Sequence, residues 1–183
     1  MGLTLFAKQG YHGTGIKEIV EAAGVPKGSF YNYFSSKEVF AEAIIRHYAA
    51  GYWCEWSSYF ASGPVDDPFA ALRYSFEMML SKHQESEVKI GCVVFNLAAE
   101  ISESSELCRN TMQSVIIEWR ERFSKYVRSA QEHGTVRSDM TAEDLADIFC
   151  NAWEGSLLRM KIENSTQPLK LCITIMFDKF LKG

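Results

Sequence analysis

Residues 26–34 divide into an apolar face and a polar face when they are placed at helical spacing. Phe30 and Phe34 stand four residues apart and are expected to pack against neighbouring helices. The rest of the arc holds small, polar or basic residues: Lys27, Gly28, Ser29, Tyr31 and Asn32. A helix that enters the major groove of DNA buries a few apolar side chains and offers such polar groups to the bases. The segment therefore has the composition of a DNA-reading helix.

The residues around this segment suit contacts with phosphates. Tyr33 and Lys37 can reach phosphates beside the groove, and the missing side chain of Gly28 permits a close approach to DNA. Thr14 offers a hydroxyl group and the N-terminus of a helix to another phosphate. A purely structural pair of helices joined by a glycine turn is the alternative, because many such pairs do not bind DNA.

Among the five cysteines, Cys92 has the sequence context that most favours a reactive thiol. It follows Gly91 and falls in the first turn of an expected helix, where the dipole and free backbone N–H groups stabilise a thiolate. The alternative is a buried cysteine that packs as a small hydrophobe. The remaining cysteines are expected to pack or to lie at the surface of long amphipathic helices: Cys54, Cys108, Cys150 and Cys172. Five scattered cysteines without a C-x-x-C pair argue against disulfides and zinc, and they predict a reducing, cytoplasmic location.

Recognisable catalytic and metal-binding patterns are missing from the sequence. The four histidines stand apart from other metal-type ligands: His12, His47, His83 and His133. The sequence contains no G-x-S-x-G, no P-loop and no G-x-G-x-x-G. We therefore expect no enzyme, no cofactor and no metal ion. The competing class is a helical-bundle ligand carrier, or an enzyme that uses a cavity among the aromatic residues.

Composition places the chain among globular proteins. It has 183 residues, of which 47% are hydrophobic and 23% charged, and a net charge of −4. No apolar run approaches the roughly 18 residues that span a bilayer, so we expect no membrane segment. Residues 1–48 hold five basic and four acidic residues, so the acidic excess lies in the remainder. A near-neutral N-terminal segment with its lysines on one face is compatible with a DNA partner.

The apolar residues recur at intervals of three and four along nearly the whole chain, which predicts an all-α fold. The expected helices are Leu3–Gln9, Gly15–Ala23, Pro26–Tyr33, 36–60, 68–84, 92–100, 109–133, 141–163 and 168–181. The second and third of these form a helix-turn-helix, because Gly24 suits a left-handed turn and Pro26 suits a helix start. The expected N-terminal caps are Thr14, Ser35 with Glu38, and Thr141 with Asp144.

The stretch from residue 22 to residue 38, AAGVPKGSFYNYFSSKE, resembles the DNA-binding domain of the TetR family of transcriptional regulators. The detailed resemblance covers roughly residues 3–48. The segment GCVVFNLAAE at 91–100 is similar to a subgroup that includes the repressor of N-ethylmaleimide reductase. The resemblance implies a DNA-binding domain over residues 1–46 and an effector-binding and dimerisation domain over residues 47–183.

The resemblance also implies a role for each residue of the DNA-binding part. It assigns Lys27, Tyr33, Lys37 and Thr14 to phosphates, and it places Tyr31 and Asn32 at base edges. Asn32 stands where many members of the family carry histidine, so no base preference is carried over.

In the second domain, the resemblance implies a cavity for an apolar or aromatic effector. The residues expected there are Trp53, Phe95, Trp119 and Trp153, although plain core packing is the better explanation for any one of them taken singly. Lys161 matches a lysine of the electrophile-sensing subgroup, and an ammonium group near Cys92 would lower the pKa of that thiol. A reversible ligand and a modification of Cys92 therefore stay open as alternatives.

The helices at 141–163 and 166–181 are expected to form a four-helix bundle with a second copy of the chain. Ala152, Gly155 and Ser156 would let these helices approach closely, and burial within one chain is the alternative. The expected function is that of a homodimeric repressor. It would leave a palindromic operator when a small-molecule or electrophilic effector binds.

Overall fold

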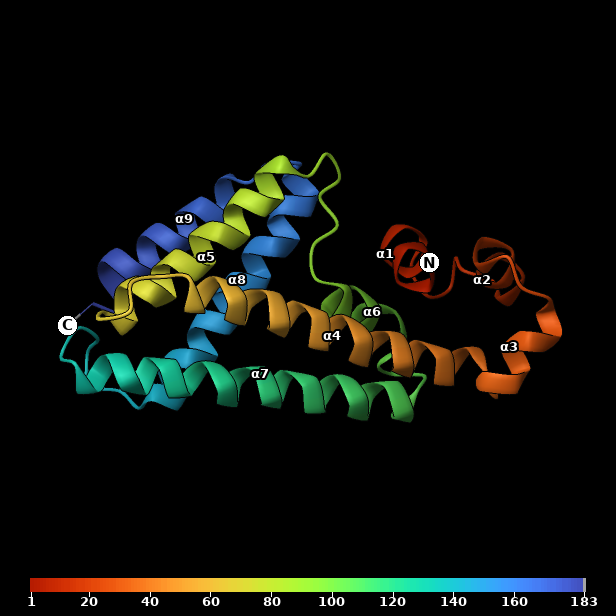
Figure 1. Cartoon of the computed structure of the whole chain (residues 1–183), viewed down its shortest axis with the longest axis horizontal. Helices are drawn as coiled ribbons and strands as arrows, with labels where there is room; N and C mark the ends of the chain where they lie inside the picture. The colour runs from red at the N-terminus through yellow and green to blue at the C-terminus, as the bar shows by residue number, and fades with distance from the viewer. Residues whose placement is uncertain (183) are drawn as a thin grey trace. The chain divides into compact units, whose positions relative to one another are not determined.

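The computed structural model describes residues 1–182, and within them the regular structure is helical (Figure 1). Nine α-helices lie in this part of the chain: α1 (Gly2–Gln9), α2 (Ile16–Ala23), α3 (Lys27–Tyr33), α4 (Lys37–Ala61), α5 (Pro68–Glu85), α6 (Val93–Ile101), α7 (Glu106–Glu132), α8 (Ala142–Glu163) and α9 (Gln167–Ile175). A short π-helix, η1 (Met176–Phe180), follows, and Val136 and Lys182 form an isolated β-bridge. The all-α prediction is confirmed. Among the helices of residues 1–182, none combines the length and the apolar character that crossing a membrane requires.

The chain forms two compact units that do not follow the order of the sequence. Unit 1 consists of Met1–Gly51 and Cys92–Ile116, and unit 2 consists of Tyr52–Gly91 and the chain from Ile117 onward. Helix α6 and the first part of α7 therefore pack with the N-terminal helices, although they are distant in sequence. The functional boundary expected between residues 46 and 47 stays a prediction.

Aromatic side chains form the core of unit 1. Phe6 and Phe30 are 1% and 4% exposed, and both rings pack on Phe40, at centroid distances of 5.7 and 5.5 Å. Phe34 packs on Phe40 at 5.0 Å. The expectation that Phe30 and Phe34 face inward is confirmed. Because burying one such side chain stabilises a fold by about 1.5–3 kcal/mol, this cluster fixes α3 against its neighbours.

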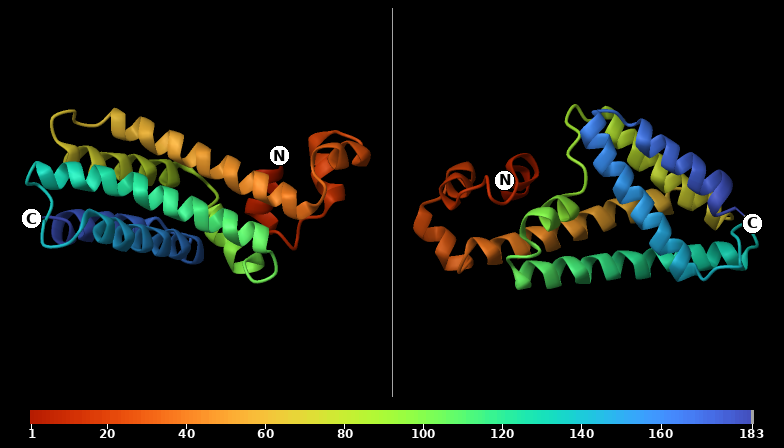
Figure 2. Two further views of the ribbon diagram at one scale, coloured as in Figure 1. Left: turned by 90° about the horizontal axis from the view of Figure 1, so that it is seen from below. Right: turned by 180° about the vertical axis from the view of Figure 1, so that it is seen from behind.

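Unit 2 is a bundle in which α9 lies beside both α5 and α8 (Figures 1 and 2). Its core is also aromatic. Phe76 on α5 lies 4.5 Å from Phe149 and 4.9 Å from Trp153, measured between ring centroids. Phe123 on α7 lies 4.9 Å from Phe149. The last expected helix does not continue to residue 181, because after α9 the backbone widens into η1.

The N-terminal ends of the helices confirm one predicted cap and contradict two. Thr141 caps α8, since its hydroxyl accepts the N–H of Asp144 at 3.1 Å. The cap of α4 is one residue later than expected: the hydroxyl of Ser36, and not of Ser35, accepts the N–H of Val39. Thr14 does not cap α2, because that position belongs to Gly15.

Candidate nucleic-acid interface

Helix α3 presents a polar surface over a buried aromatic anchor. Tyr31 and Tyr33 are 50% and 81% exposed, whereas Phe30, directly before them in the sequence, is only 4% exposed. The other predicted contact residues of this helix are exposed or, for Ser29, half-buried: Lys27, Gly28, Ser29 and Asn32. A Cβ atom added at Gly28 would meet nothing within 4 Å, so this position leaves open space. The structure thus brings six of the predicted DNA-contacting residues together on one accessible helix.

The turn before α3 has the backbone that the sequence predicted. Gly24 adopts φ 67° and ψ 29°, the left-handed conformation that glycine accepts without steric cost. The N–H of Val25 donates to the carbonyl of Val20 at 3.0 Å, which closes the end of α2. Val25 itself is 42% exposed. This geometry sets the angle at which α3 leaves α2.

Thr14 is buried in the turn before α2. It is 0% exposed, and its hydroxyl donates to the carbonyl of Gly10 at 2.7 Å. The carboxylate of Glu18 accepts the N–H of Gly15 at 2.7 Å at the start of α2. In this structure the Thr14 hydroxyl is thus engaged within the turn, and its contact with a phosphate stays a prediction.

Lys37 is the first residue of α4, and its ammonium group lies over the ring of Tyr11, 4.2 Å from the ring centroid. This is a cation–π contact, which keeps the charge in place. Partial burial lowers the pKa of Lys37, although the nearby carboxylates of Glu100 and Glu18 act in the opposite direction. Tyr11 was not among the predicted site residues, because it lies in a turn where no helical periodicity marks it.

Helix α6 holds the turn between α1 and α2. The carboxylate of Glu100 accepts the backbone N–H of His12 at 3.0 Å, and the carbonyl oxygen of Glu100 lies 3.2 Å from His12 Nε2. Gly10 passes so close that an added Cβ would lie 2.2 Å from the Glu100 carboxylate. This contact could not be predicted from the sequence, because the partners stand 88 residues apart.

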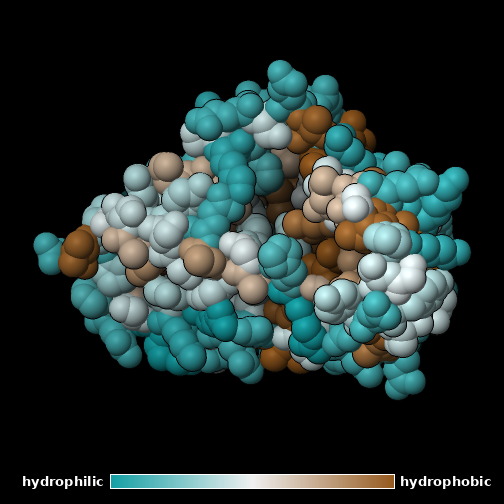
Figure 3. All heavy atoms as spheres, turned by 45° about the vertical axis from the view of Figure 1, so that its right-hand side comes forward, coloured by the Kyte–Doolittle hydropathy of each residue, from teal (hydrophilic) through white to brown (hydrophobic). Residues whose placement is uncertain are grey.

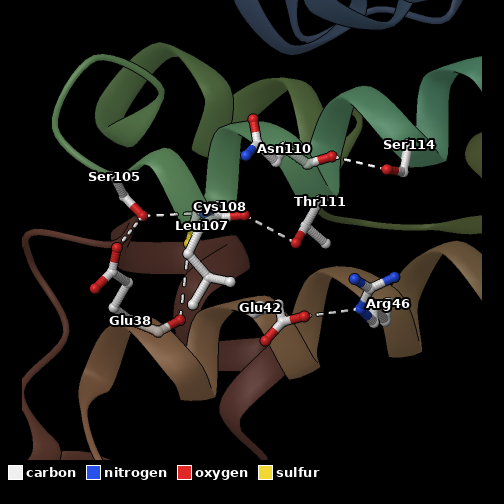
Figure 4. A network of polar contacts seen from close by, with 9 residues as sticks. All are labelled: Glu38, Glu42, Arg46, Ser105, Leu107, Cys108, Asn110, Thr111 and Ser114. Carbon is white, nitrogen blue, oxygen red and sulfur yellow. Dashed lines mark hydrogen bonds and ion pairs between the residues drawn. The ribbon is translucent and has the colours of Figure 1, made fainter.

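A second set of contacts joins the starts of α4 and α7 (Figure 4). The hydroxyl of Ser105 donates to the carboxylate of Glu38 and accepts the N–H of Cys108, the latter at 3.0 Å. The thiol of Cys108 lies 3.7 Å from the carbonyl oxygen of Glu38. Burial raises the pKa of Cys108, so this thiol stays protonated and acts in packing. The first turn of α4, directly after α3, is thus fixed to α7.

Comparison with known proteins places this arrangement in a family. Residues 2–44 match the model described as bacterial regulatory proteins, tetR family, and residues 68–176 match the model described as tetracyclin repressor-like, C-terminal domain. The chain belongs to the TetR family. The resemblance seen in the sequence is thereby confirmed.

Relatives of this TetR-family chain are named transcriptional repressors. The HTH-type transcriptional repressor DhaR of Mycobacterium sp. (strain GP1) is 33% identical over 180 residues, which cover 98% of this chain and 88% of the relative. The HTH-type transcriptional repressor NemR of Escherichia coli (strain K12) is 31% identical over 170 residues, which cover 92% and 84%. These relatives are DNA-binding regulators rather than enzymes, and the chain is accordingly a DNA-binding transcriptional regulator.

Solved structures agree with this assignment. The crystal structure of regulatory protein TetR from Rhodobacter sphaeroides aligns with a TM-score of 0.87 at 32% identity, covering 98% of this chain and 94% of that one. The crystal structure of Escherichia coli NemR in its reduced form aligns with a TM-score of 0.88 at 26% identity, covering 100% and 93%. The similarity therefore extends over both units.

Three of the four aromatic residues expected around an effector lie in unit 2 of this TetR-family regulator. The ring of Trp119 packs on Tyr52 at 5.1 Å, and Nε1 of Trp153 donates to the Tyr52 hydroxyl at 3.1 Å. Trp53 stacks on Trp56 instead, at 5.0 Å. The fourth is Phe95. It belongs to α6 in unit 1 and is 39% exposed.

Cys92 and Lys161 differ in their surroundings. Cys92 is the N-cap residue of α6 rather than part of its first turn, and it is only 3% exposed. Lys161 is exposed on α8 in unit 2, whereas Cys92 belongs to unit 1. The burial of Cys92 restricts the access of a reagent to its sulfur.

Across residues 1–182, no three His, Cys, Asp or Glu side chains are grouped as a metal site would require.

Proposed function

We propose that this regulator represses transcription by placing α3 of each of two copies in the major groove of a palindromic operator. The observation that carries the proposal is the accessible polar face of α3, with Tyr31 and Tyr33 exposed and Phe30 anchored beneath them. Lys27, Tyr33 and Lys37 contact phosphates, and Tyr31 and Asn32 contact base edges. A groove-reading helix needs this division of roles, because phosphate contacts position the protein whereas base contacts provide specificity.

The proposal requires a homodimer, and α8 and α9 support it. Both helices expose apolar side chains at helical spacing: Ile148, Leu158 and Ile162 on α8, and Leu171 and Ile175 on α9. Groups of apolar residues reach the surface between hydrophilic ones (Figure 3). Gly155 shares the exposed stripe of α8, and an added Cβ there would meet nothing within 4 Å. Two such faces that pair around a two-fold axis bury these side chains and match the symmetry of a palindrome.

Release from the operator requires an effector, and the aromatic cluster of unit 2 favours a reversible small-molecule ligand. Trp53, Trp119 and Trp153 offer flat apolar surfaces of the kind that bind such ligands. Modification of Cys92 is the second candidate, favoured by the position of this thiol at the start of α6. Its 3% exposure makes it the weaker of the two.

Fluorescence anisotropy tests both parts of the proposal. A binding site selected from random DNA is titrated with the wild-type protein and with a double variant, Tyr31→Ala and Asn32→Ala. The proposal predicts that the wild type binds this site specifically. The affinity of the double variant should be lower by at least about tenfold, since each lost base contact costs about 1–3 kcal/mol. Equal binding by the two proteins would contradict it.

The effector is tested on the same complex. A neutral aromatic ketone, 1-indanone, and an electrophile, 1,4-benzoquinone, are each added to the wild type and to Cys92→Ser. Release by indanone from both proteins supports the reversible ligand. Release by benzoquinone from the wild type alone supports modification of Cys92.

A further inference from the structure

The two buried tryptophans of unit 2 differ in their hydrogen bonding. Trp153 is 3% exposed, and its Nε1 donates to the hydroxyl of Tyr52 at 3.1 Å. Trp56 is 2% exposed, but its buried Nε1 meets no hydrogen-bond acceptor in the part of the chain that the structure describes. A buried N–H group without an acceptor is unfavourable, because it has given up its bond to water and gained none in return.

Trp56 is surrounded by aromatic rings, some of them buried and some close to the surface. Phe76 and Phe123 are fully buried, with centroids 5.9 and 6.1 Å from that of Trp56. Half-buried rings pack on it at 5.0 to 5.6 Å: Trp53, Phe60 and Tyr126. Trp56 therefore borders both the buried core and rings that reach the surface.

The charged groups at the edge of this cluster are already paired. Lys82 Nζ donates to Glu55 Oε1 at 2.6 Å, and Glu55 also accepts the hydroxyl of Tyr59 at 3.0 Å. Arg122 pairs with Glu118 and lies over the ring of Trp53, 4.9 Å from its centroid. Since these charges are neutralised within the protein, the surroundings of Trp56 suit a neutral molecule rather than an ion.

We infer that Trp56 Nε1 is the hydrogen-bond donor of the effector site, and that the effector is a neutral, planar molecule with one carbonyl-type acceptor. The aromatic rings bind the plane of the molecule, and the indole N–H orients it. This inference rests on the proposed release by a reversible ligand and adds the chemical class of that ligand. Indole donors of this kind give specificity, because a ligand without the acceptor leaves the N–H unpaired.

The test compares 1-indanone with indane, which has the same bicyclic skeleton without the carbonyl group. Affinities are measured by calorimetric titration of the full-length protein. The inference predicts that Trp56→Phe lowers the preference for indanone over indane by about tenfold. The control, Ser75→Ala, removes a buried donor of unit 2 that is already bonded, to the carbonyl of Leu72 at 2.7 Å, and keeps the preference of the wild type. An unchanged preference in Trp56→Phe, or no binding of indanone to the wild type, would overturn the inference.

A spectroscopic measurement keeps the test valid if Trp56→Phe folds poorly. The protein is labelled with ¹⁵N at its indole nitrogens, and the four tryptophan resonances are followed as indanone is added. The inference predicts that the Trp56 N–H resonance moves downfield, whereas the Trp153 resonance moves little. If the Trp56 N–H points into the face of a neighbouring ring instead, its resonance stays in place while indanone binds, and the inference fails.

The failure of this inference can be told apart from the failure of the proposed function. Indanone that binds through Trp56 but leaves the affinity for DNA unchanged would contradict the release mechanism and preserve the site. A different ligand that releases DNA equally well from the wild type and from Trp56→Phe would contradict the site and preserve the mechanism.

Discussion

The carboxylate of Glu100, at the end of α6, accepts the backbone N–H of His12 in the turn between α1 and α2, at a distance of 3.0 Å. The same turn ends at Thr14, from which the chain enters α2 and then α3. Helix α6 thus contacts the turn between α1 and α2, and all three helices belong to unit 1. The turn that leads into α2 is bonded to a residue that lies far outside the N-terminal domain recognised in the sequence.

Replacing Glu100 by alanine is expected to lower the free energy of unfolding by about 1 kcal/mol, because His12 then exchanges its acceptor for water. We also expect operator affinity to fall several-fold, since α2 and α3 lose their attachment to α6. Chemical denaturation and anisotropy measure the two effects. Glu103→Ala removes an exposed carboxylate just beyond α6 and serves as the control. If both variants bind DNA equally well, Glu100 does not position α3.

Gly10 and Gly24 differ in what an added side chain would meet. Both have positive φ, 74° and 67°, but their ψ angles differ. Gly24, with ψ 29°, is left-handed, where alanine costs about 1 kcal/mol, whereas Gly10, with ψ −179°, is in a region that essentially only glycine adopts, where the cost is about 1–3 kcal/mol. At Gly24 the new Cβ meets nothing within 4 Å, whereas at Gly10 it displaces the Glu100 carboxylate from His12. Denaturation should therefore show a larger loss for Gly10→Ala than for Gly24→Ala. In a Glu100→Ala background, the loss for Gly10→Ala should become smaller, because only the backbone strain then remains, and an undiminished loss would place the clash elsewhere.

Lys27 is expected to contribute affinity without sequence preference. Lys27→Ala should weaken binding to operator and to unrelated DNA by the same factor, and it should reduce the slope of log affinity against log salt concentration by about one. Lys17→Ala changes a lysine on α2 that pairs with Glu21 at 3.7 Å, and it should leave the slope unchanged. Titrations at several salt concentrations check both variants. A Lys27→Ala protein with an unchanged slope would rule out the phosphate contact.

His83 on α5 makes stability depend on pH. Burial, and then the neighbouring charges of Lys82 and Lys89, lower the pKa of His83 from 6.5 to about 4. Below pH 6.5 the unfolded chain therefore binds a proton that the folded chain does not bind until about pH 4. The free energy of unfolding should fall by up to about 3 kcal/mol across this range.

His83→Gln should remove this loss and flatten the profile between pH 6.5 and pH 4. Urea denaturation at intervals across the range measures it. His133→Gln, a change at an exposed histidine, serves as the control and should follow the wild-type profile. A His83→Gln protein with the wild-type profile would assign the pH dependence to other groups.

Most of the fold could be predicted because it depends on local signals. Helical spacing located the elements, and Gly24 marked the turn before α3, since a left-handed residue there requires glycine. The cap of α4 was misplaced by one residue, because Ser35 and Ser36 are chemically equal at that point of the sequence. Thr14 was misassigned for a different reason. A threonine before a helix suggests a cap, but its hydroxyl bonds backwards to Gly10.

The tertiary parts of the site could not be predicted from the sequence. The contact of Glu100 with His12 and that of Ser105 with Glu38 join residues that are 88 and 67 positions apart. Neither pair has a periodic pattern that links its members. Phe95 was grouped with the effector residues because it is aromatic, yet it lies exposed on α6 in unit 1. Residue type alone does not tell to which unit a side chain belongs.

In the proposed complex, α3 of each of two copies reads one half of a palindromic site. Hydroxyl-radical footprinting on a site selected from random DNA examines this arrangement. Two bound copies give two-fold symmetric protection centred on two major grooves about one helical turn apart, and this protection is lost when Tyr31 and Asn32 are both replaced by alanine. Protection without symmetry, or a footprint that the double variant retains, would rule out this arrangement.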